Sequence, residues 1–259
     1  MLELNKVYNE DCIGDNGMCI IEDKSIDLIL CDLPYGTTQA KWDSVIPLDK
    51  LWLQYERIIK ENGAIVLFGA EPFSSYLRLS NIKLFRYDWI WHKNKPSGFA
   101  NAKNQPMRSH ETISVFYKKK PTYNPIKEAR DVTEASAKRN NYKYTTGEVK
   151  SDLHNITGVR KENYEDLRYP TSVQKFNVVV NAKNKLHPAQ KPVELLGYLI
   201  KTYSNEGELI LDNCMGSFTT AIACINTNRN YIGFENDEKY FELGQERVRL
   251  HKEGLLVNK

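Results

Sequence analysis

The sequence has no apolar run that approaches the roughly 20 residues of a membrane-spanning helix. Its first six residues lack the charged and apolar regions of a secretory signal. The 5 cysteines are widely spread and form no C-x-x-C pair, which argues against a zinc site or a disulfide framework. Internal repeats and low-complexity tracts are also absent. We therefore expect a cytoplasmic protein with reduced thiols, no membrane contact and no metal.

Charge is close to balanced over the 259 residues, yet it is unevenly distributed. The net charge is +3, but residues 118–186 hold 15 Lys or Arg against 8 Asp or Glu, and the flanking segments are mildly acidic. Tyrosines are interspersed with these cations, and aromatic rings can stack on bases. The segment is therefore either a DNA-binding region that contacts phosphates or a solvated insertion. On the first interpretation, the candidate DNA contacts are Lys138, Arg139, Lys143 and Lys150.

The tetrapeptide Asp32-Leu33-Pro34-Tyr35 directly follows an apolar run at residues 26–31. This order is typical of a buried strand whose C-terminal end reaches the ligand crevice of an open α/β sheet. Asp32 and a backbone carbonyl next to Pro34 can accept hydrogen bonds from an NH2 group, and Tyr35 can stack on a flat ring. The segment therefore predicts either a site for a planar amine or an ordinary turn after a strand.

A second apolar strand, residues 209–212, leads into a Gly/Ser turn and then into a helix. Another strand follows at residues 231–234 and ends at Glu235. Glu235 thus lies roughly 20 positions after the turn, the spacing at which a carboxylate reaches ribose hydroxyls in a nucleotide-binding β-α-β unit. Because the turn lacks a full G-x-G, an ordinary strand-turn-helix with a solvated Glu235 stays open.

Together these segments resemble the amino-DNA methyltransferases. Residues 32–35 are similar to their D-P-P-Y catalytic motif, and residues 212–219 to their D-P-F-x-G-S-G-T motif for S-adenosylmethionine (SAM). Residues 187–192 are similar to the H-P-x-Q-K-P segment that precedes the SAM motif. The catalytic motif comes before the SAM motif here, which is the permuted order of the β class. The resemblance covers both ends of the chain and leaves residues 120–185 unmatched.

The resemblance implies an α/β domain with the Rossmann-like SAM-dependent methyltransferase fold, in which a mixed, mostly parallel seven-stranded sheet is circularly permuted. Residues 1–117 would form the catalytic half of this domain. Residues 118–186 would form a target-recognition insertion, and residues 187–259 the SAM-binding half.

By analogy with these enzymes, the strand that ends at Asp212 is central in the sheet. The strands that end at Asp11 and Glu235 would lie on one side of it. On the other side would lie the strands that end near Asp32, Phe68, Trp91 and Phe116. Asp32 and Asp212 would then end adjacent strands at a reversal of strand order, which is where such sheets bind ligands.

The spacing of apolar residues predicts the remaining secondary structure. Helices are expected at residues 12–22, 48–60, 71–79, 193–203 and 237–250. Asn62-Gly63 would end the second of them. Strands at residues 85–92 and 112–117 would be joined by a polar loop, residues 93–108, near the catalytic face.

The activity implied by the resemblance is methyl transfer from SAM to the N6 amine of adenine in duplex DNA, with the base flipped out of the helix. Asp32, Leu33, Pro34 and Tyr35 would be catalytic. The residues implied to bind SAM are Asp11, Cys12, His187, Lys191, Pro192, Asp212, Met215, Gly216, Ser217, Thr219, Glu235 and Asn236. Asp212 and Lys191 would face the methionine end of SAM. Double-stranded DNA is the expected partner in a bacterial or phage setting, and a homodimer and a cognate restriction endonuclease are left open.

Two departures from the family motifs bear on function. Leu33 replaces the first proline of D-P-P-Y, which matters little if its backbone carbonyl does the work. Phe218 replaces a glycine that would let the backbone approach the cofactor closely. Its ring is therefore expected to crowd or reshape the SAM pocket.

Other functions stay open at this point. Cytosine N4 methylation is the alternative most similar to the implied activity. Adenine is favoured over cytosine only because the tetrapeptide begins with Asp32 and not with Ser. Cytosine C5 methylation needs a cysteine nucleophile, but Cys31 is not followed by proline and is expected to point into the core. RNA or protein amino-methyltransferases with a similar tetrapeptide carry the SAM turn before it, the opposite order. The last alternative is a degenerate DNA- or SAM-binding protein, against which the intact Asp32 and Glu235 argue.

Overall fold

The computed structural model describes residues 3–40, 42–129, 167–180 and 186–255. Within these ranges, no helix is both long and apolar enough to cross a bilayer. The chain divides into two units. One consists of Met1–Asn124 together with Thr171–Lys259, and the other of Pro125–Pro170.

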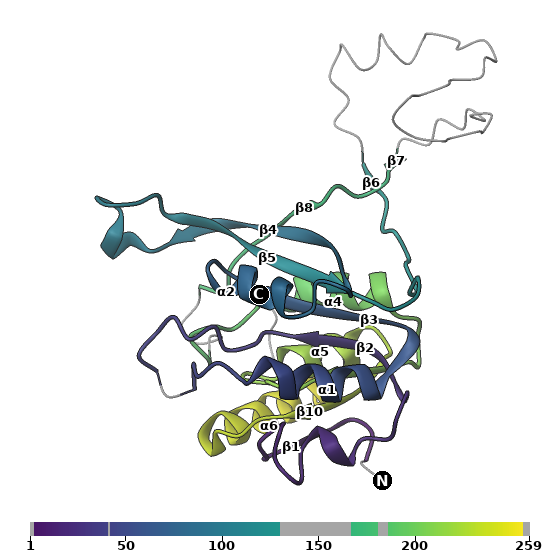
Figure 1. Cartoon of the computed structure of the whole chain (residues 1–259). Coiled ribbons are helices and arrows are strands. Elements are labelled where there is room, and N and C mark those ends of the chain that lie inside the picture. The colour runs from purple at the N-terminus through teal and green to yellow at the C-terminus, as the bar shows by residue number, and fades with distance from the viewer. Residues whose placement is uncertain (1–2, 41, 130–166, 181–185, 256–259) are drawn as a thin grey trace, which may run out of the picture. The chain divides into compact units, whose positions relative to one another are not determined.

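The larger unit is built on a mixed sheet of eight described strands, in the order β1-β10-β9-β2-β3-β5-β4-β8 (Figure 1). Pairing is parallel from β1 to β3, β5 is antiparallel to β3 and β4, and β8 is parallel to β4. This sheet confirms the predicted fold class, and β8 adds an eighth strand to the seven expected. The strands are β1 (Lys6–Tyr8), β2 (Ile26–Cys31), β3 (Ile59–Gly69), β4 (Phe85–Ser97), β5 (Arg108–Phe116), β8 (Val173–Phe176), β9 (Leu209–Asp212) and β10 (Asn230–Phe234).

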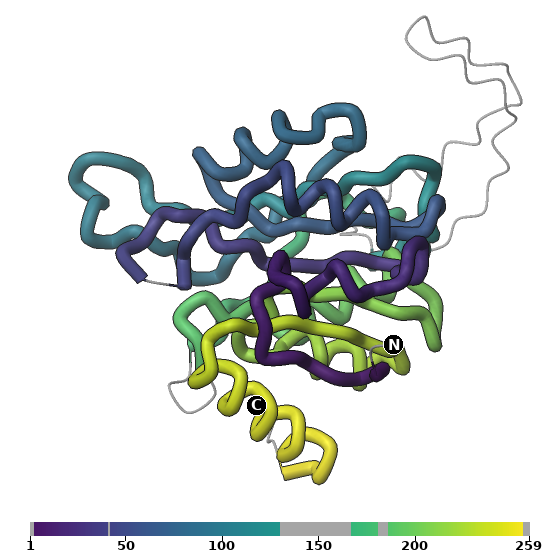
Figure 2. Tube along the Cα trace, turned by 60° about the horizontal axis from the view of Figure 1, so that its bottom comes forward, coloured from purple at the N-terminus to yellow at the C-terminus, as the bar shows by residue number. Residues whose placement is uncertain are grey.

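Strands from the two ends of the sequence are interleaved in this sheet. β2 pairs with β9 in the register Leu28↔Ile210 and Ile29↔Leu211. Asp32, directly after β2, and Asp212, the last residue of β9, therefore lie at the ends of adjacent strands, as predicted. Figure 2 shows the N-terminal segment beside the C-terminal one, where β1 pairs with β10. Residues far apart in the sequence thus share one edge of the sheet.

Helices cover both faces of the sheet. Alternation along β2 directs Leu28 and Leu30 into a core with α4 and α5, while Ile29 and Cys31 pack with α1 on the opposite face. Burial on both faces explains why β2 is a continuous apolar run. The described helices are α1 (Leu48–Ile58), α2 (Phe73–Ser80), α4 (Val193–Tyr203), α5 (Thr219–Asn226) and α6 (Glu238–Lys252).

Two sequence predictions on the N-terminal side are wrong. The helix expected at residues 12–22 is a series of turns with one short 3-10 segment, Met18–Ile20. A Cβ at Gly17 would lie 2.4 Å from the Asp11 carbonyl oxygen, so this chain packing requires glycine. Asn62-Gly63 does not end α1, which stops at Ile58. Both residues lie inside β3, where a bulge opposite Asp27 takes up the extra residues.

The polar loop expected at residues 93–108 is largely a hairpin. β4 and β5 continue past the predicted strands, pair as far as Ser97↔Arg108, and project from the sheet (Figure 1). The turn contains a short 3-10 segment, Phe99–Asn101. Residues 94–108 are all exposed, so the sequence contains no alternating pattern to mark strands there. We call residues 93–108 the hairpin arm.

The smaller unit is described only at its two ends. β6 (Glu128–Ala129) pairs antiparallel with β7 (Leu167–Arg168), and Arg168 Nη2 lies 3.7 Å from Glu128 Oε2. The predicted DNA contacts lie outside the described residues. They are Lys138, Arg139, Lys143 and Lys150.

Candidate active site

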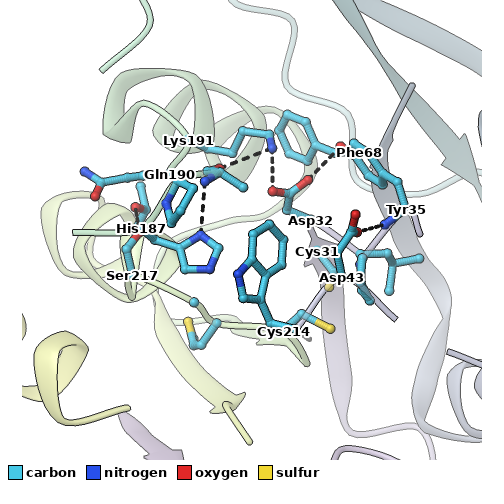
Figure 3. Close-up of a pocket in the computed structure, with 18 of the residues that line it drawn as sticks. Cys31, Asp32, Tyr35, Asp43, Phe68, His187, Gln190, Lys191, Cys214 and Ser217 are labelled. Atoms are coloured by element: carbon cyan, nitrogen blue, oxygen red, sulfur yellow. Dashed lines mark hydrogen bonds and ion pairs between the residues drawn. The ribbon is translucent and has the colours of Figure 1, made fainter. Parts of the chain in front are cut away.

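A cavity of about 830 Å³ lies at the C-terminal ends of β2, β9 and β10. Its wall includes every catalytic and SAM-binding residue expected from the sequence except Pro192, which caps the start of α4. Figure 3 shows Asp32 and Tyr35 facing Lys191 and His187 across this cavity. The fold therefore brings the tetrapeptide and the glycine turn to one site.

Both carboxylate oxygens of Asp32 are occupied. Tyr35 Oη donates a hydrogen bond to Asp32 Oδ1 at 2.7 Å, and Lys191 Nζ forms a hydrogen-bonded ion pair with Oδ2 (Figure 3). Burial raises the pKa of Asp32, the Lys191 charge opposes this shift, and the Glu111 charge adds to it. The carboxylate is thus held in a fixed orientation at the cavity wall.

Lys191 stands between two carboxylates. Its Nζ contacts Asp32 and also lies 3.4 Å from Glu111 Oε2. Burial disfavours the charged form, but Asp32 and Glu111 outweigh burial and raise the pKa of Lys191. The lysine is therefore protonated. The resemblance implied that Lys191 faces the methionine end of SAM, and in the structure its ammonium pairs with Asp32 of the catalytic tetrapeptide.

The other tetrapeptide residues divide between core and cavity. The Tyr35 ring stacks on Phe73, with ring centroids 5.2 Å apart and an interplanar angle of 26°. Leu33 is 3 % exposed, and its side chain packs in the core on the α1 side of the sheet. Replacement of proline by leucine there changes an apolar contact and leaves the polar groups of the tetrapeptide in place.

Asp43 fixes the loop that follows the tetrapeptide. Its Oδ1 accepts hydrogen bonds from the backbone N–H groups of Tyr35 and Gly36, at 2.8 and 2.9 Å. Its Oδ2 accepts from Thr37 and Thr38, at 2.9 and 2.7 Å. Burial opposes ionisation, but these donors outweigh it and lower the pKa of Asp43. A single carboxylate therefore holds the loop against the cavity.

Glu235 bonds to the glycine turn. Its Oε2 accepts a hydrogen bond from Gly216 N at 2.6 Å, and its Oε1 accepts one from Asp237 N at 2.9 Å. Burial raises the pKa of Glu235, and the two backbone donors oppose the shift. Gly216 has φ of +51°, a conformation in which glycine is unstrained. The carboxylate at the end of β10 and the turn after β9 therefore form one rigid edge of the cavity.

Asp212 lies deeper in the same cavity. Its Oδ2 accepts a hydrogen bond from Thr220 Oγ1 at 2.5 Å, and its Oδ1 accepts one from Cys214 N at 3.0 Å. Burial raises the pKa of Asp212 to about 6 despite these donors. A charge at this position is therefore costly until a cation or further donor reaches it.

The expectation that Phe218 crowds the cavity is wrong. Phe218 does not line the cavity, and its side chain is 1 % exposed within the core. Its backbone has φ of +58°, the left-handed conformation that glycine usually supplies. The turn therefore has a backbone conformation that glycine favours, while the Phe218 ring lies in the core and not in the cavity.

Cys31, which directly precedes the tetrapeptide, is not an activated nucleophile. Burial raises the pKa of Cys31 to about 12, so its thiol is not ionised at neutral pH. This disfavours the cytosine C5 mechanism. Within the described residues, no group of His, Cys, Asp or Glu side chains is arranged to hold a metal ion.

His187 lies between two aromatic rings at the front of the cavity. Ring centroids are 4.3 Å apart for His187 and Tyr240, and 4.7 Å apart for His187 and Trp42. Ala189 N donates a hydrogen bond to His187 Nδ1 at 3.1 Å, so a neutral ring carries its proton on Nε2. The histidine thereby links the loop after the tetrapeptide to α6.

The DNA methylase family model matches residues 26–246 of the chain. The chain belongs to this family. It is 30% identical over 256 residues to the type II methyltransferase M1.MboII of Moraxella bovis, covering 93% of this chain and 95% of that protein. It is 28% identical over 244 residues to the DNA adenine methyltransferase YhdJ of Escherichia coli (strain K12), covering 87% and 76%.

Solved structures share the fold of this DNA methylase. The M1.HpyAVI–SAM complex matches with a TM-score of 0.62 at 23% identity, covering 95% of this chain and 99% of that chain. The PvuII DNA methyltransferase, which is cytosine-N4-specific, matches with a TM-score of 0.63 at 16% identity, covering 93% and 85%. The family therefore establishes a SAM-dependent DNA methyltransferase, with adenine N6 and cytosine N4 as the two candidate targets.

Among the charged residues that line the cavity of this DNA methylase, six were not predicted from the sequence. They are Glu10, Asp43, Lys93, Lys95, Glu111 and Asp237. Asp43 binds backbone N–H groups of the loop to which it belongs, and no sequence motif identifies this residue. Glu111 could have been found from the sequence, because it directly precedes the apolar part of a strand. That strand, β5, is antiparallel to β3, so the N-terminal side of its apolar part lies at the same edge as the C-terminal ends of the parallel strands. Lys93 Nζ lies 3.3 Å from Glu111 Oε1, a pairing that becomes visible only in the hairpin.

Proposed function

We propose that this DNA methylase is a permuted, β-class enzyme that transfers a methyl group from SAM to N6 of adenine in duplex DNA. The observation that carries the proposal is the single cavity that joins the Asp32 tetrapeptide to the Gly216 turn and Glu235. An amine acceptor and a nucleotide-binding unit in one cavity are what this reaction needs, because positioning supplies much of the rate. The chain order, with the tetrapeptide first, supports the β class. Asp at position 32 supports adenine over cytosine.

The cavity has room for SAM, and its SAM-binding half offers acceptors for the ribose hydroxyls. A cavity of about 830 Å³ lies within the range of small-molecule sites. Each oxygen of Glu235 accepts one backbone N–H and keeps a lone pair for a ribose hydroxyl. Gly216 allows the backbone to approach the ligand. When bound, SAM supplies a methyl group on a positively charged sulfur, which is a good leaving group.

Asp32 and the Leu33 carbonyl accept the two N–H groups of the target amine in the proposed mechanism. These hydrogen bonds favour a pyramidal nitrogen, whose lone pair is then free to attack the methyl carbon. The raised pKa of Asp32 suits this carboxylate to take the proton that the methylated nitrogen releases. Tyr35 stacks on the flipped base, and its own ring is held from behind by Phe73.

Two parts of the chain are the proposed DNA contacts. The hairpin arm carries the exposed cations Lys95, Lys103 and Arg108 and no Asp or Glu, and its base lines the cavity. Phe99, near the turn of the arm, is 83 % exposed, and apolar side chains of this kind can wedge between base steps. Residues 118–186 remain the proposed target-recognition region between the catalytic half, residues 1–117, and the SAM-binding half, residues 187–259. A cognate restriction endonuclease is a further proposed partner. The proposal is supported by M1.MboII, a relative that is named a type II methyltransferase.

A methyl-transfer assay tests the proposal directly. The purified chain is incubated with labelled SAM and unmethylated duplex DNA, and the DNA is digested and its nucleosides are identified by mass spectrometry. We expect N6-methyldeoxyadenosine, and base-resolved mapping then gives the target sequence. N4-methyldeoxycytidine instead would assign the other target amine. Binding of SAM and DNA without any methylated product would identify a degenerate binding protein.

A further inference from the structure

The Lys191 ammonium occupies the place on Asp32 that the proposed mechanism gives to the target amine. It donates to Asp32 Oδ2, while Tyr35 Oη holds Oδ1 (Figure 3). It also lies over aromatic rings, 5.9 Å from the Tyr35 centroid and 5.3 Å from the Phe68 centroid. A charged donor is a stronger partner for a carboxylate than a neutral NH2 group. The target amine therefore has to compete with Lys191 for this oxygen.

Glu111 offers a second acceptor for the same ammonium. Its Oε1 lies 3.3 Å from Lys93 Nζ. Its Oε2 lies 3.4 Å from Lys191 Nζ, within ion-pair range, yet this buried oxygen has no hydrogen bond of normal geometry. Buried polar atoms in folded proteins are nearly always hydrogen-bonded, so an acceptor left open beside a charged donor calls for an explanation.

The charges of the cluster allow Lys191 to change partner without a change of protonation. Burial opposes ionisation of Glu111, but Lys191 and Lys93 outweigh it and lower the pKa of Glu111. Lys191 itself is protonated, because Asp32 and Glu111 raise its pKa. The two carboxylates and two ammonium groups balance. Movement of the Lys191 ammonium from one carboxylate to the other therefore exchanges one ion pair for another.

We propose that Glu111 is a positioning residue that receives the Lys191 ammonium when the target amine binds to Asp32. The proposal rests on the proposed function, because it assumes that Asp32 accepts the amine. In the free protein Lys191 holds Asp32 in orientation. In the complex its hydrogen bond passes to Glu111 Oε2, and Asp32 Oδ2 turns to the amine. The alternative is that Glu111 only neutralises two buried lysines.

Binding to duplexes with and without the amine separates these two roles. Once the target sequence is mapped, dissociation constants are measured in the presence of S-adenosylhomocysteine for a duplex with adenine at the target position and for one with purine, which lacks the amine. The wild type should prefer adenine by about tenfold. Glu111→Gln should reduce this preference to less than about threefold, because Lys191 then stays on Asp32. It should also lower kcat by about 10- to 100-fold while the SAM dissociation constant stays within about threefold.

The double variant Glu111→Gln/Lys191→Met should recover the preference for adenine, since nothing then competes for Asp32. Glu61→Gln is the matched control. Glu61 also pairs with two lysines, Lys24 at 3.6 Å and Lys119 at 3.4 Å, but it lies on the surface and outside the cavity wall. It should leave the preference and kcat unchanged.

An unchanged preference for adenine in Glu111→Gln, or an equal loss of affinity for both duplexes, would overturn the proposal. If Glu111→Gln does not fold, Lys191→Met tests the premise of the exchange, which is that Lys191 competes with the target amine for Asp32. This variant should prefer adenine at least as strongly as the wild type, and a lost preference would show that Lys191 holds the base instead. Methyl transfer by the wild type is measured in the same series, so failure of the proposed function is recognised separately from failure of this exchange.

Discussion

The ring of Phe218 fills the space that the absent side chain of Gly244 leaves on α6. A Cβ built on Gly244 would lie 2.2 Å from Cδ1 of Phe218. The ring also packs against Phe241, with centroids 6.0 Å apart. Any side chain larger than glycine at position 244 would therefore collide with the Phe218 ring. The SAM turn is supported from behind by this contact.

Substitution of Phe218 should affect stability and not the cofactor. Phe218→Ala should lower the free energy of unfolding by about 3–5 kcal/mol, because it leaves a cavity under α6. Phe218→Gly should be less damaging by roughly 1 kcal/mol, since glycine adopts φ of +58° without strain. Urea denaturation gives both free energies of unfolding. Calorimetry, under conditions in which the variants are folded, should show a SAM dissociation constant within about threefold of the wild-type value. A large loss of SAM affinity in a stable variant would show that the Phe218 ring does contribute to the cofactor site.

Loss of the Asp32 carboxylate should abolish methyl transfer while SAM binding persists. Asp32→Ala removes the acceptor for the target amine, and we expect kcat to fall on the order of 10²–10⁴-fold. Asp32→Asn is the matched control, because it keeps one acceptor oxygen and the shape of the side chain. It should retain more activity than Ala. Near-normal turnover by the Ala variant would remove Asp32 from the mechanism.

Glu235→Ala should weaken SAM binding by about 10- to 150-fold, the effect of losing hydrogen bonds to a charged acceptor. The same change releases Gly216 N and Asp237 N, so thermal unfolding has to be measured beside calorimetry. Glu235→Gln keeps one acceptor oxygen, so its SAM affinity should lie between those of the wild type and Glu235→Ala. Unchanged affinity in a folded Ala variant would mean that the glycine turn and Glu235 do not form a nucleotide site.

Asp212 should make the SAM-free protein less stable as the pH rises through 6. Its pKa in the folded state, about 6, lies above the ordinary value of 3.8, so folding favours the protonated form. This contribution is fully present below the unfolded pKa and is lost as the pH rises through the folded pKa. Between pH 5 and 8 the loss amounts to about 1 kcal/mol. Asp212→Asn should remove that part of the pH dependence of the free energy of unfolding, measured from denaturation curves. The same pH dependence in Asp212→Asn and in the wild type would contradict the prediction.

The order of the strands was predicted from the resemblance to the amino-DNA methyltransferases. The location of the site was predicted because motif residues directly follow buried strands. β2 and the helix α4 have the predicted bounds, since their apolar residues face packed neighbours throughout. The hairpin arm could not be predicted, because none of residues 94–108 is buried. The helix expected at residues 12–22 failed for another reason. Its apolar spacing is real, but Gly14 and Gly17 close turns on Asp11 and Gly14 carbonyl groups.

Motifs identified the residues that would meet SAM and the base, but not those that hold them in place. Asp43 reaches four backbone N–H groups only after the loop has closed. Lys191 was assigned from its motif to the cofactor, and its pairing with Asp32 depends on two segments that meet across the cavity. Hydrogen bonds between distant loops follow from tertiary packing, which local sequence patterns do not encode.

The hairpin arm should supply part of the affinity for every duplex, independent of sequence. Lys95 and Lys103 are exposed, and no acidic residue of the arm neutralises them. The double charge reversal Lys95→Glu/Lys103→Glu should weaken binding to target and non-target duplexes alike. It should also reduce the slope of log affinity against log salt by roughly two units, about 0.9 for each phosphate that is no longer neutralised. Lys83→Glu is the control, because Lys83 is exposed and precedes β4 at the end remote from the arm. It should leave the slope unchanged.

The same salt titration applied to Lys138, Arg139, Lys143 and Lys150 tests whether the region of residues 118–186 also holds DNA. Reversals there should likewise flatten the slope, since each phosphate contact contributes independently to counterion release. Exchange of the whole region for that of another DNA methylase should change the methylated sequence, because contacts to base edges carry the sequence choice. SAM affinity should stay constant in the four charge-reversal variants, since the residues expected to bind SAM belong to the two flanking segments. If a folded, active chimera methylates the original sequence, recognition lies in the hairpin arm. The arm reversals should then be combined with Phe99→Ala, because an exposed apolar ring can wedge between base steps.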